Sequence, residues 1–412
     1  MSQAHSSSTA AEKQLPFTEF VALMASLTAL VAVSIDGMLP ALPAIGADLG
    51  VLDPNDSQLV VSYLLLGLGF GQLLFGPLSD SIGRKPAIYG GLVLFIGGAT
   101  LAMLAPSFQW MLAGRLLQGL GAAGPRGVSM ALIRDRFKGD AMARVMSFIM
   151  GVFILVPIVA PSLGQGILHF ASWQAVFGMF ILLAILAGSW FALRQPETLT
   201  PERRIPLQPA RIMAGFRTVL SNRVVLGYTL AAGVISGAFV GYLSSSQQIF
   251  QTTFAVGDSF PIYFGALSAG SGLASFTNAR LVMRFGMQWL TTMSARALTG
   301  MSAVFLLIAL LLDRQPPFWL ALVYLFAMFF CIGILFGNMN SLAMEPLGHV
   351  AGTGAAVVGS LSTIISSQLG AMVGQAYDGT MVPLVTGFVV LGLGNLLLMW
   401  WAETGRKTLP AV

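Results

Sequence analysis

The chain has 412 residues, of which 56% are hydrophobic and only 9% are charged, and its mean hydropathy is +0.81. A soluble protein carries about 25% charged residues because its surface must stay hydrated, so this composition excludes a water-soluble domain of this size. Twelve membrane spans of about 20 apolar residues each would use about 240 residues, and the chain is long enough to supply them. We therefore expect a polytopic membrane protein.

Several common chemical sites are absent from the sequence. A single cysteine, Cys331, cannot form an intramolecular disulfide or a multi-cysteine zinc site, and the three histidines are far apart, at His5, His169 and His349. The chain has no Gly-Lys pair of a nucleotide-binding P-loop and no metalloprotease or serine-hydrolase motif. The sequence therefore predicts no metal, no cofactor, no ATP site and no enzyme.

The long apolar runs form two sets of six. We expect membrane spans, in chain order, at residues 17–45, 58–78, 86–106, 109–133, 145–168, 174–193, 224–249, 260–283, 288–312, 317–340, 353–376 and 382–402. The first set forms a bundle at 17–193 and the second a bundle at 224–402, joined by a linker at 194–223. The ends at 1–16 and 403–412 are expected to be cytoplasmic tails, the first of them disordered. This pattern predicts an all-α membrane protein with a duplicated six-helix unit.

The charges outside the spans predict the orientation of the chain. The linker contains Arg194, Arg203, Arg204, Arg211, Arg217 and Arg223 against Glu197 and Glu202. Loops on the same side hold Arg84, Lys85, Arg134, Arg136, Lys138, Arg144, Arg280 and Arg284, whereas the opposite loops hold six aspartates and one base, Arg314. Because basic loops remain in the cytoplasm, we expect both termini there. The net charge of +5 then faces the inner leaflet, and a nucleic-acid partner is not expected.

The loop between the second and third spans carries the most specific motif. Residues 71–86 contain Gly76, Asp80, Gly83, Arg84 and Lys85 in register, and the loop resembles the signature loop of the major facilitator superfamily. The equivalent loop of the second half reads Asn278-Ala-Arg280-Leu-Val-Met283-Arg284-Phe-Gly286, with methionine in place of the acid. Such weak internal similarity between the two halves is typical of transporters built from a repeated unit.

Two further spans contain patterns of the same superfamily. The fourth span contains Arg115, Gln118 and Gly119, which resembles a proton-linked Arg-x-x-Gln-Gly pattern. The fifth span is similar to the motif of drug–proton antiporters, although Ala160 and Gln165 replace glycines. The residues of this antiporter-motif helix are Gly151, Pro157, Pro161 and Gly164. An ordinary proline-kinked helix is the alternative interpretation.

Two segments point to one branch of the superfamily. Residues 34–43, Ser-Ile-Asp-Gly-Met-Leu-Pro-Ala-Leu-Pro, and residues 344–354 before the eleventh span are similar to the Bcr/CflA branch of drug exporters, which includes the bicyclomycin-resistance transporter. The resemblance extends from about residue 25 to residue 400. It implies two six-helix bundles around a central cavity that opens alternately to either side.

Asp36 is the strongest candidate for proton coupling. An acid within a span costs about 2.5–3.5 kcal/mol, so it usually faces a cavity and has a partner. Counted from the outer ends of their spans, Asp36 lies about 15 Å deep and Arg115 about 12 Å deep at 1.5 Å per residue. We therefore expect the two residues to be coupled. The alternative is a fixed ion pair that only holds the first and fourth spans together.

Other polar and aromatic residues are weaker candidates. The central cavity is expected to be lined by Tyr63, Gln118, Phe239, Tyr242, Asn338 and Gln368. Such residues are equally often interhelical hydrogen bonds or packing. Arg126 and Arg296 lie deep in their predicted spans and have side chains long enough to snorkel toward polar surroundings.

A cytoplasmic gate is predicted at the signature loop. The hypothesis is that Asp80, with Arg84, latches the halves together against the start of the eleventh span near Thr353, where a helix N-terminus attracts a carboxylate. Gly76, Gly83 and Lys85 complete this gate. The rival hypothesis is that the loop only sets topology.

The expected function is proton-coupled export of small, amphipathic, antibiotic-like molecules across the bacterial inner membrane, with protons, a small-molecule substrate and membrane lipid as partners of a monomer. Export or proton symport of a natural metabolite, such as a nucleoside or an amino acid, is the main alternative. A non-transporting membrane protein or an intramembrane enzyme is a remote one, because the spans contain no clustered metal ligands or nucleophiles.

Overall fold

The computed structural model describes residues 15–406, so most of the two predicted tails, at 1–14 and 407–412, lies outside the described residues. Twelve helices of 20 residues or more are present: α1 (Phe17–Asp36), α3 (Leu59–Ile82), α4 (Arg84–Met103), α5 (Phe108–Arg136), α6 (Gly139–Leu168), α7 (Gln174–Arg194), α9 (Arg223–Gln248), α10 (Phe260–Phe285), α11 (Met287–Leu311), α12 (Phe318–Met344), α13 (Ala351–Gln375) and α14 (Val382–Arg406). Two shorter helices are α2 (Leu42–Asp48) and α8 (Pro209–Ser221).

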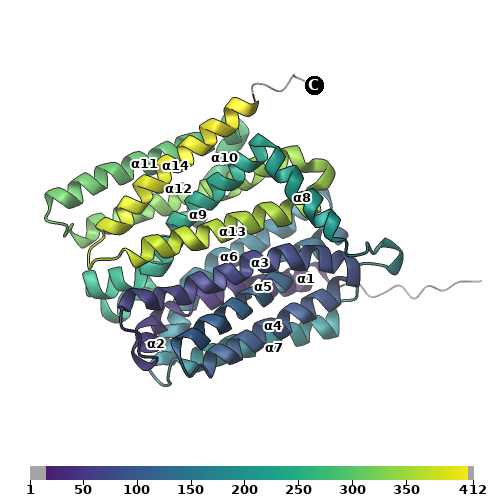
Figure 1. Ribbon diagram of the computed structural model, residues 1–412, viewed down its shortest axis with the longest axis horizontal. Coiled ribbons are helices and arrows are strands. Elements are labelled where there is room, and N and C mark those ends of the chain that lie inside the picture. The colour runs from purple at the N-terminus through teal and green to yellow at the C-terminus, as the bar shows by residue number, and fades with distance from the viewer. Residues whose placement is uncertain (1–14, 407–412) are drawn as a thin grey trace, which may run out of the picture.

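The helices form two bundles of six. In the first, α5 packs against α3 and α4, and α1 packs against α6 and α7; in the second, α9 packs against α13 and α14, and α12 packs against α10 and α11. The two bundles meet where α3 contacts α13 and where α6 contacts α10. Figure 1 shows them as a purple-to-blue half and a green-to-yellow half lying side by side.

Most long helices are apolar enough to cross a membrane. Within residues 15–406, nine helical segments meet the requirements of length and hydropathy. The other three long helices are α5, which contains several arginines, α6, whose described apolar stretch is the shorter Leu155–Leu168, and α10, which contains several serines and glycines. Polar residues are tolerated in such helices when they face neighbouring helices rather than lipid.

Glycines allow the helices of the first bundle to touch through their backbones. A Cβ atom at Gly67 on α3 would overlap the carbonyl oxygen of Leu116, and one at Gly119 on α5 would overlap the carbonyl oxygen of Leu64. Small residues at such crossings let membrane helices approach closely and gain van der Waals contact. The glycine of the Arg-x-x-Gln-Gly pattern therefore fixes the distance between α5 and α3.

The first predicted span is not one continuous helix. The helix α1 ends at Asp36, and a 3₁₀ turn at Leu39–Ala41 then leads into the short helix α2. Pro40 and Pro43 occupy the first positions of the turn and of α2. Because proline lacks a backbone N–H, it is favoured at such starts and interrupts a continuing helix. Asp36 therefore lies at a helix end rather than within a helix.

The linker is more ordered than its composition suggests. It contains a 3₁₀ turn at Pro201–Arg203 and the helix α8, which packs on α13. The side chain of Asn222 then accepts hydrogen bonds from the backbone N–H groups of Val224 (3.0 Å) and Val225 (3.2 Å), which caps α9. We call the end of the molecule that carries the linker the linker end, and the opposite end, with η2 (Pro54–Gln58), the far end.

Candidate functional site

Asp36 is buried at the junction of α1 with α6. Its exposed fraction is 5%, and among the described side chains its carboxylate makes no hydrogen bond or ion pair. The next residue, Gly37, contacts α6 so closely that a Cβ atom at Gly164 would overlap the Gly37 carbonyl oxygen. The carbonyl oxygen of Ala160 lies only 3.4 Å from where a Cβ of Gly37 would be. The antiporter-motif helix, α6, therefore packs directly against the backbone of α1 next to Asp36.

Arg115 is fully buried on α5 and joins three helices. Its Nε donates to the carbonyl oxygen of Val60 on α3 (3.0 Å), its Nη1 to Oε1 of Gln118 (2.9 Å) and its Nη2 to the carbonyl oxygen of Ser34 on α1 (2.9 Å). The guanidinium also lies 5.8 Å from the ring centre of Phe177 on α7. All these partners are neutral, so no carboxylate contacts the guanidinium among the described residues.

The structure brings Arg115 and Asp36 to the same stretch of α1, but not into contact. Arg115 reaches α1 at Ser34, two residues before the acid, and within the described residues no ion pair joins the two side chains. The fixed ion pair is therefore not formed in this conformation. Gln118 is bonded to Arg115, and its amide nitrogen lies 3.4 Å from the Ser34 hydroxyl, so it supports the arginine.

Two predicted cavity residues, Phe239 and Tyr242, belong to an aromatic cluster in the second bundle. Their rings are stacked with centres 6.5 Å apart. The sequence did not indicate the other members of this aromatic cluster, Phe264 on α10 and Phe329 and Phe336 on α12. Phe329 packs edge-on against Tyr242 at 4.9 Å and against Phe239 at 5.5 Å. Phe329 and Phe336 are seven residues apart, two turns along one helix face, which is the signal that would have identified them.

Tyr242 connects this aromatic cluster to the acid. Its hydroxyl is buried and has no hydrogen-bond partner among the described residues. Asp36, in the other half, is followed closely by the 3₁₀ turn Leu39–Ala41. The helix α9 also contacts the 3₁₀ turn that follows α1. The acid of one bundle and the aromatic cluster of the other therefore face one another.

The remaining predicted cavity residues lie elsewhere. Asn338 on α12 exchanges two hydrogen bonds with Asn278 on α10 (3.0 and 2.8 Å), so its amide joins two helices of one bundle. Gln368 is exposed and donates to Ser367 (3.4 Å), and Tyr63 is half-buried on α3. None of these three takes part in the ring contacts of the aromatic cluster.

The antiporter-motif helix is packed tightly at one end only. Gly164 contacts α1, whereas Gly151 is exposed and has open space around it. Pro161 is buried and Pro157 half-buried, and α6 continues through both. Close packing is therefore confined to the part of the motif beside Asp36.

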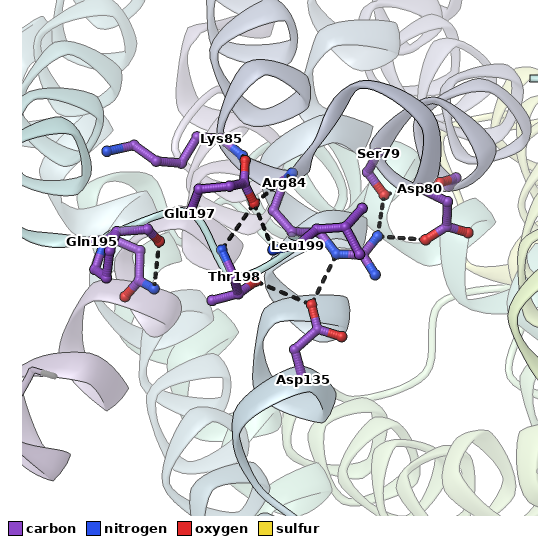
Figure 2. Close-up of polar contacts among 11 residues, drawn as sticks. Ser79, Asp80, Arg84, Lys85, Asp135, Gln195, Glu197, Thr198 and Leu199 are labelled. Carbon is purple, nitrogen blue, oxygen red and sulfur yellow. Dashed lines mark hydrogen bonds and ion pairs between the residues drawn. The ribbon is translucent and has the colours of Figure 1, made fainter. Parts of the chain in front are cut away.

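Arg84 lies at the centre of a polar network at the linker end (Figure 2). Its Nη1 contacts Oδ1 of Asp80 at 2.5 Å and Oγ of Ser79 at 2.8 Å, and its Nε contacts Oδ2 of Asp135 at 3.0 Å. The arginine is buried, and Asp135 comes from the end of α5. The signature loop is thus bonded to the neighbouring helix of its own bundle.

Glu197 from the linker closes this network. Its carboxylate accepts hydrogen bonds from the backbone N–H groups of Arg84 (3.0 Å) and Lys85 (2.9 Å), the first residues of α4. Thr198 adds a bond from its hydroxyl to Asp135 (3.1 Å). A carboxylate satisfies the free N–H groups of a helix N-terminus and interacts favourably with its dipole. Sequence reasoning missed Glu197 because it assigned the linker no fold.

Gly83 permits this arrangement. Its φ of +111° is unfavourable for other residues, and a Cβ there would lie 2.7 Å from Glu197. Lys85 Nζ reaches the carbonyl oxygen of Ala192 at 3.3 Å. Together these contacts tie the start of α4 to the end of α7 and to the linker.

The predicted latch between Asp80 and the eleventh span is not among the contacts that the structure describes. The Asp80 carboxylate bonds Arg84, and its backbone carbonyl accepts from Ile205 of the linker (2.9 Å). Thr353 at the start of α13 lies against α8, beside Gly215. Gly76 faces Ala356, whose Cβ is 3.5 Å from where a Gly76 Cβ would be. Small residues therefore let the two halves approach closely here.

At the far end the halves are joined by side-chain hydrogen bonds. Asn55 donates to the carbonyl oxygens of Gln375 (3.0 Å) and Tyr377 (2.8 Å), and Gln248 donates to Asn55 (2.9 Å). Gln58 bonds Gln248 as well. We call these five residues the far-end clasp. It holds the first bundle to both α9 and α13, so the far end is closed.

The fold and these contacts define a polytopic membrane protein of the alternating-access transporter class: two six-helix halves, a closed far end and a buried acid where the halves face one another. A family model described as the Major Facilitator Superfamily matches residues 24–374, and the chain belongs to this superfamily. Transporters of this type carry small-molecule substrates.

Bacterial relatives match nearly the whole chain. An uncharacterized MFS-type transporter, YdgK, of Bacillus subtilis (strain 168) is 31% identical over 379 residues, 91% of this chain and 93% of the relative. A bicyclomycin resistance protein homolog of Haemophilus influenzae is 31% identical over 372 residues, 89% of this chain and 91% of the relative. Multidrug resistance protein D of Escherichia coli (strain K12) is 27% identical over 397 residues, 90% of this chain and 91% of the relative.

Two solved structures share the fold. The human organic anion transporter MFSD10 superposes with a TM-score of 0.69 at 20% identity, covering 94% of this chain and all of the other. A peptide transporter, POT, superposes with a TM-score of 0.71 at 14% identity, covering 94% of both chains. These likenesses support the twelve-helix architecture.

Proposed function

We propose that this protein is a proton-coupled exporter, an antiporter that moves small, amphipathic, drug-like molecules out of a bacterial cell across its inner membrane. The observation that carries the proposal is Asp36, a buried carboxylate with no bonded partner among the described residues, between the antiporter-motif helix and Tyr242. Relatives named for bicyclomycin and multidrug resistance support export of drugs.

The charge distribution supports the proposed orientation. Basic residues gather at the linker end, whereas Asp53, Asp56 and Asp258 lie near the far end. Since basic loops remain in the cytoplasm, the linker end is cytoplasmic, with both chain termini, and the far end is external. The conformation described above is then closed to the outside. We further propose that the transporter acts as a monomer.

In the proposed mechanism the substrate stacks on the aromatic cluster, opposite Asp36. Burial disfavours a charged carboxylate and a cation beside it favours the charged form, so an arriving cationic substrate changes the balance between the two forms. Arg115 acts as a positioning residue, because its bonds fix α1, α3 and α5 around the acid. Protonation from outside and release inside then drive the exchange of conformations.

The energy available is sufficient. One inward proton gains about 2.3 kcal/mol per 100 mV of membrane potential and about 1.4 kcal/mol per pH unit. The sum of about 3.7 kcal/mol sustains a several-hundred-fold gradient of a neutral substrate.

Everted vesicles that contain the Asp36→Asn variant test the proposal. With an imposed pH gradient, we expect uptake of a fluorescent drug by the native protein, none by Asp36→Asn, and normal uptake by the exposed Asp313→Asn control. Gradient-dependent uptake by Asp36→Asn at the native rate would refute the assignment. Uptake of a nucleoside or an amino acid but of no drug, or transport only in the inward direction, would favour the metabolite exporter or symporter.

A further inference from the structure

The helix α8 packs over the contact between the two bundles at the linker end. Its Gly215 lies against Thr353 and Val357 of α13, and its Ile212 lines a small space together with Leu73 of α3. Thr353 belongs to the first turn of α13. In Figure 1, α8 lies across the start of α13 rather than alongside it. The helix α8 therefore reaches both bundles near the ends of their membrane spans.

The side of this contact that α8 covers is the side that faces lipid. On α3, Gln72 faces α13 and donates a hydrogen bond to it. On one flank of this line, Phe70 and Leu74 are 46% and 51% exposed, whereas Leu68 on the opposite flank is fully buried. An exposed apolar flank of a membrane span faces the acyl chains. Since each residue turns a helix by about 100°, Leu73 lies between Gln72 and the lipid-facing flank, and α8 lies there too.

The helix α8 is too short to cross the membrane. Its 13 residues extend for about 20 Å at 1.5 Å per residue, whereas the hydrocarbon core is about 30 Å thick. Its apolar part, Ile212–Ser221, is shorter still. A short apolar helix on the lipid-facing side of the spans, level with the first turn of α13, is placed to lie in the surface of the membrane.

The apolar surface of α8 is wider than the part that packs on protein. Gly215 and Val219 are buried against the bundles, but Met213 and Leu220 are 68% and 53% exposed. Met213 and Leu220 are seven residues apart, so their side chains lie two turns apart on one side of the helix. We call these two residues the apolar flank of α8. Ala214, about 100° further round the helix from Met213, is exposed as well.

A positive charge lies at the edge of the apolar flank. Arg217 is one turn from Met213, it is exposed, and among the described residues it makes no hydrogen bond or ion pair. The chain around it, residues 203–223, contains five arginines and no acid. An amphipathic helix with exposed apolar side chains and a basic edge suits the boundary between head groups and acyl chains, and basic residues there attract anionic lipids.

We propose that α8 binds the anionic phospholipid surface of the leaflet at the linker end, with Met213 and Leu220 among the acyl chains and Arg217 on the phosphates. The side of α8 that carries Ala214 faces water. Because α8 reaches both α3 and α13, the bound leaflet holds it across the boundary between the two bundles. This surface lies away from Asp36 and does not depend on the transported substrate.

Spin labels on α8 in bilayer nanodiscs test this proposal. A nitroxide is attached to a cysteine introduced by Met213→Cys, Leu220→Cys or Ala214→Cys in the full-length chain, in which Cys331→Ser has removed the native thiol. The nanodiscs contain phosphatidylcholine and phosphatidylglycerol. Collisions with oxygen, which concentrates among acyl chains, are compared with collisions with a water-soluble nickel chelate. We expect oxygen to dominate at the first two positions and nickel at the third.

Two exposed positions elsewhere calibrate the measurement. Val93→Cys lies midway along α4 and is the reference for lipid, and Leu52→Cys at the far end is the reference for water. Labels at Met213 and Leu220 that collide with nickel as often as the label at Leu52 would overturn the proposal, because α8 would then lie in water. Protection of both from both reagents would also overturn it, because a second copy or another protein surface would then cover the apolar flank.

The role of the charge is tested with the label at Met213. Arg217→Gln should lower the ratio of lipid-embedded to water-exposed label about fivefold. Nanodiscs without phosphatidylglycerol should lower it similarly when Arg217 is present and much less in Arg217→Gln. Arg280→Gln, which removes another exposed arginine near the linker end, should leave the ratio unchanged. An unchanged ratio in Arg217→Gln, or the same ratio with and without phosphatidylglycerol, would overturn the assignment of an anionic lipid surface.

Discussion

The two halves of the molecule repeat one helix plan but stabilise it differently. At the equivalent loops, Gly83 and Gly286 both have positive φ angles, +111° and +81°. Around Gly83, however, Arg84 is bonded to two carboxylates, whereas Met283 in the second loop is 87% exposed and Arg284 stacks on Phe285. Both loops therefore have the glycine turn, but the ion-pair network is described around the first loop.

The same contrast holds inside the bundles. In the first half a fully buried arginine and glycine contacts hold the backbones of α1, α3 and α5 together. In the second half the corresponding space between α9, α10 and α12 is filled by stacked aromatic rings. The first half therefore places a buried arginine near the proposed proton site, and the second places aromatic rings opposite it. In the proposed mechanism, proton coupling and substrate binding are therefore divided between the two bundles.

The largest effect is expected at Arg115. Replacing it with leucine leaves the carbonyl oxygens of Ser34 and Val60 without their donor in a buried site, which costs about 1–3 kcal/mol for each buried group left unsatisfied. We expect no transport and a thermal midpoint lowered by several degrees. Arg115→Lys should also abolish transport, because one ammonium group cannot make the hydrogen bonds of the planar guanidinium.

A matched change in the second half sharpens this contrast. Tyr324→Phe removes only the hydroxyl bonded to Ser302 and should cost about 1 kcal/mol. Thermal unfolding of both variants in detergent, followed by tryptophan fluorescence, compares the two halves. If Arg115→Leu unfolds at the temperature of Tyr324→Phe, the buried arginine is not what stabilises the first bundle.

The next effect concerns the contact beside Asp36. In Gly164→Val the new side chain would overlap the Gly37 carbonyl oxygen, so α6 must move away from α1; such overpacking costs about 1–3 kcal/mol. In Gly151→Val, on the same helix, the side chain enters open space. We expect drug resistance in growing cells to be lost in the first variant and kept in the second. Equal behaviour of the two variants would mean that the tight contact has no role.

How well the sequence predicted these features depends on how far apart the interacting residues lie along the chain. The spans and the glycine turns follow from local patterns. The end of α1 at Asp36 was missed because Pro40 and Pro43 act on a run that hydropathy alone treats as continuous. Two of the three hydrogen-bond partners of Arg115 are backbone carbonyls, and their positions depend on how closely α1 and α3 approach α5, which no local pattern encodes.

A smaller effect is expected at Glu197. Glu197→Ala removes the acceptor for the first N–H groups of α4, and loss of such a cap costs about 0.5–2 kcal/mol. We expect faster proteolysis of the linker, measured by limited trypsin digestion, with transport reduced rather than lost. Arg284→Gln at the second loop should digest at the native rate, since an exposed residue contributes within about 0.5 kcal/mol. Equal digestion of the two variants would mean that the loops do not differ in strength.

The smallest effect tests the far-end clasp. Asn55→Ala removes hydrogen bonds to Gln375 and Tyr377 and from Gln248. Each hydrogen bond contributes about 0.5–1.5 kcal/mol net to stability. Because these bonds are partly exposed to solvent, their loss costs a total of about 1–2 kcal/mol. The equilibrium between the closed and open conformations of the far end therefore shifts about five- to thirtyfold toward the open one.

The substitution Ser244→Cys, at a buried position of α9 beneath the clasp, reports this opening in a chain whose own cysteine has been replaced by Cys331→Ser. In Asn55→Ala we expect modification by a membrane-impermeant maleimide to be faster by a similar factor, because the reagent enters only through the open far end. Asn222→Ala, which weakens the cap of α9 at the linker end, should leave the rate unchanged. Acceleration in both variants would mean that α9 loosens as a whole, whereas acceleration in Asn55→Ala alone assigns the closed far end to the clasp.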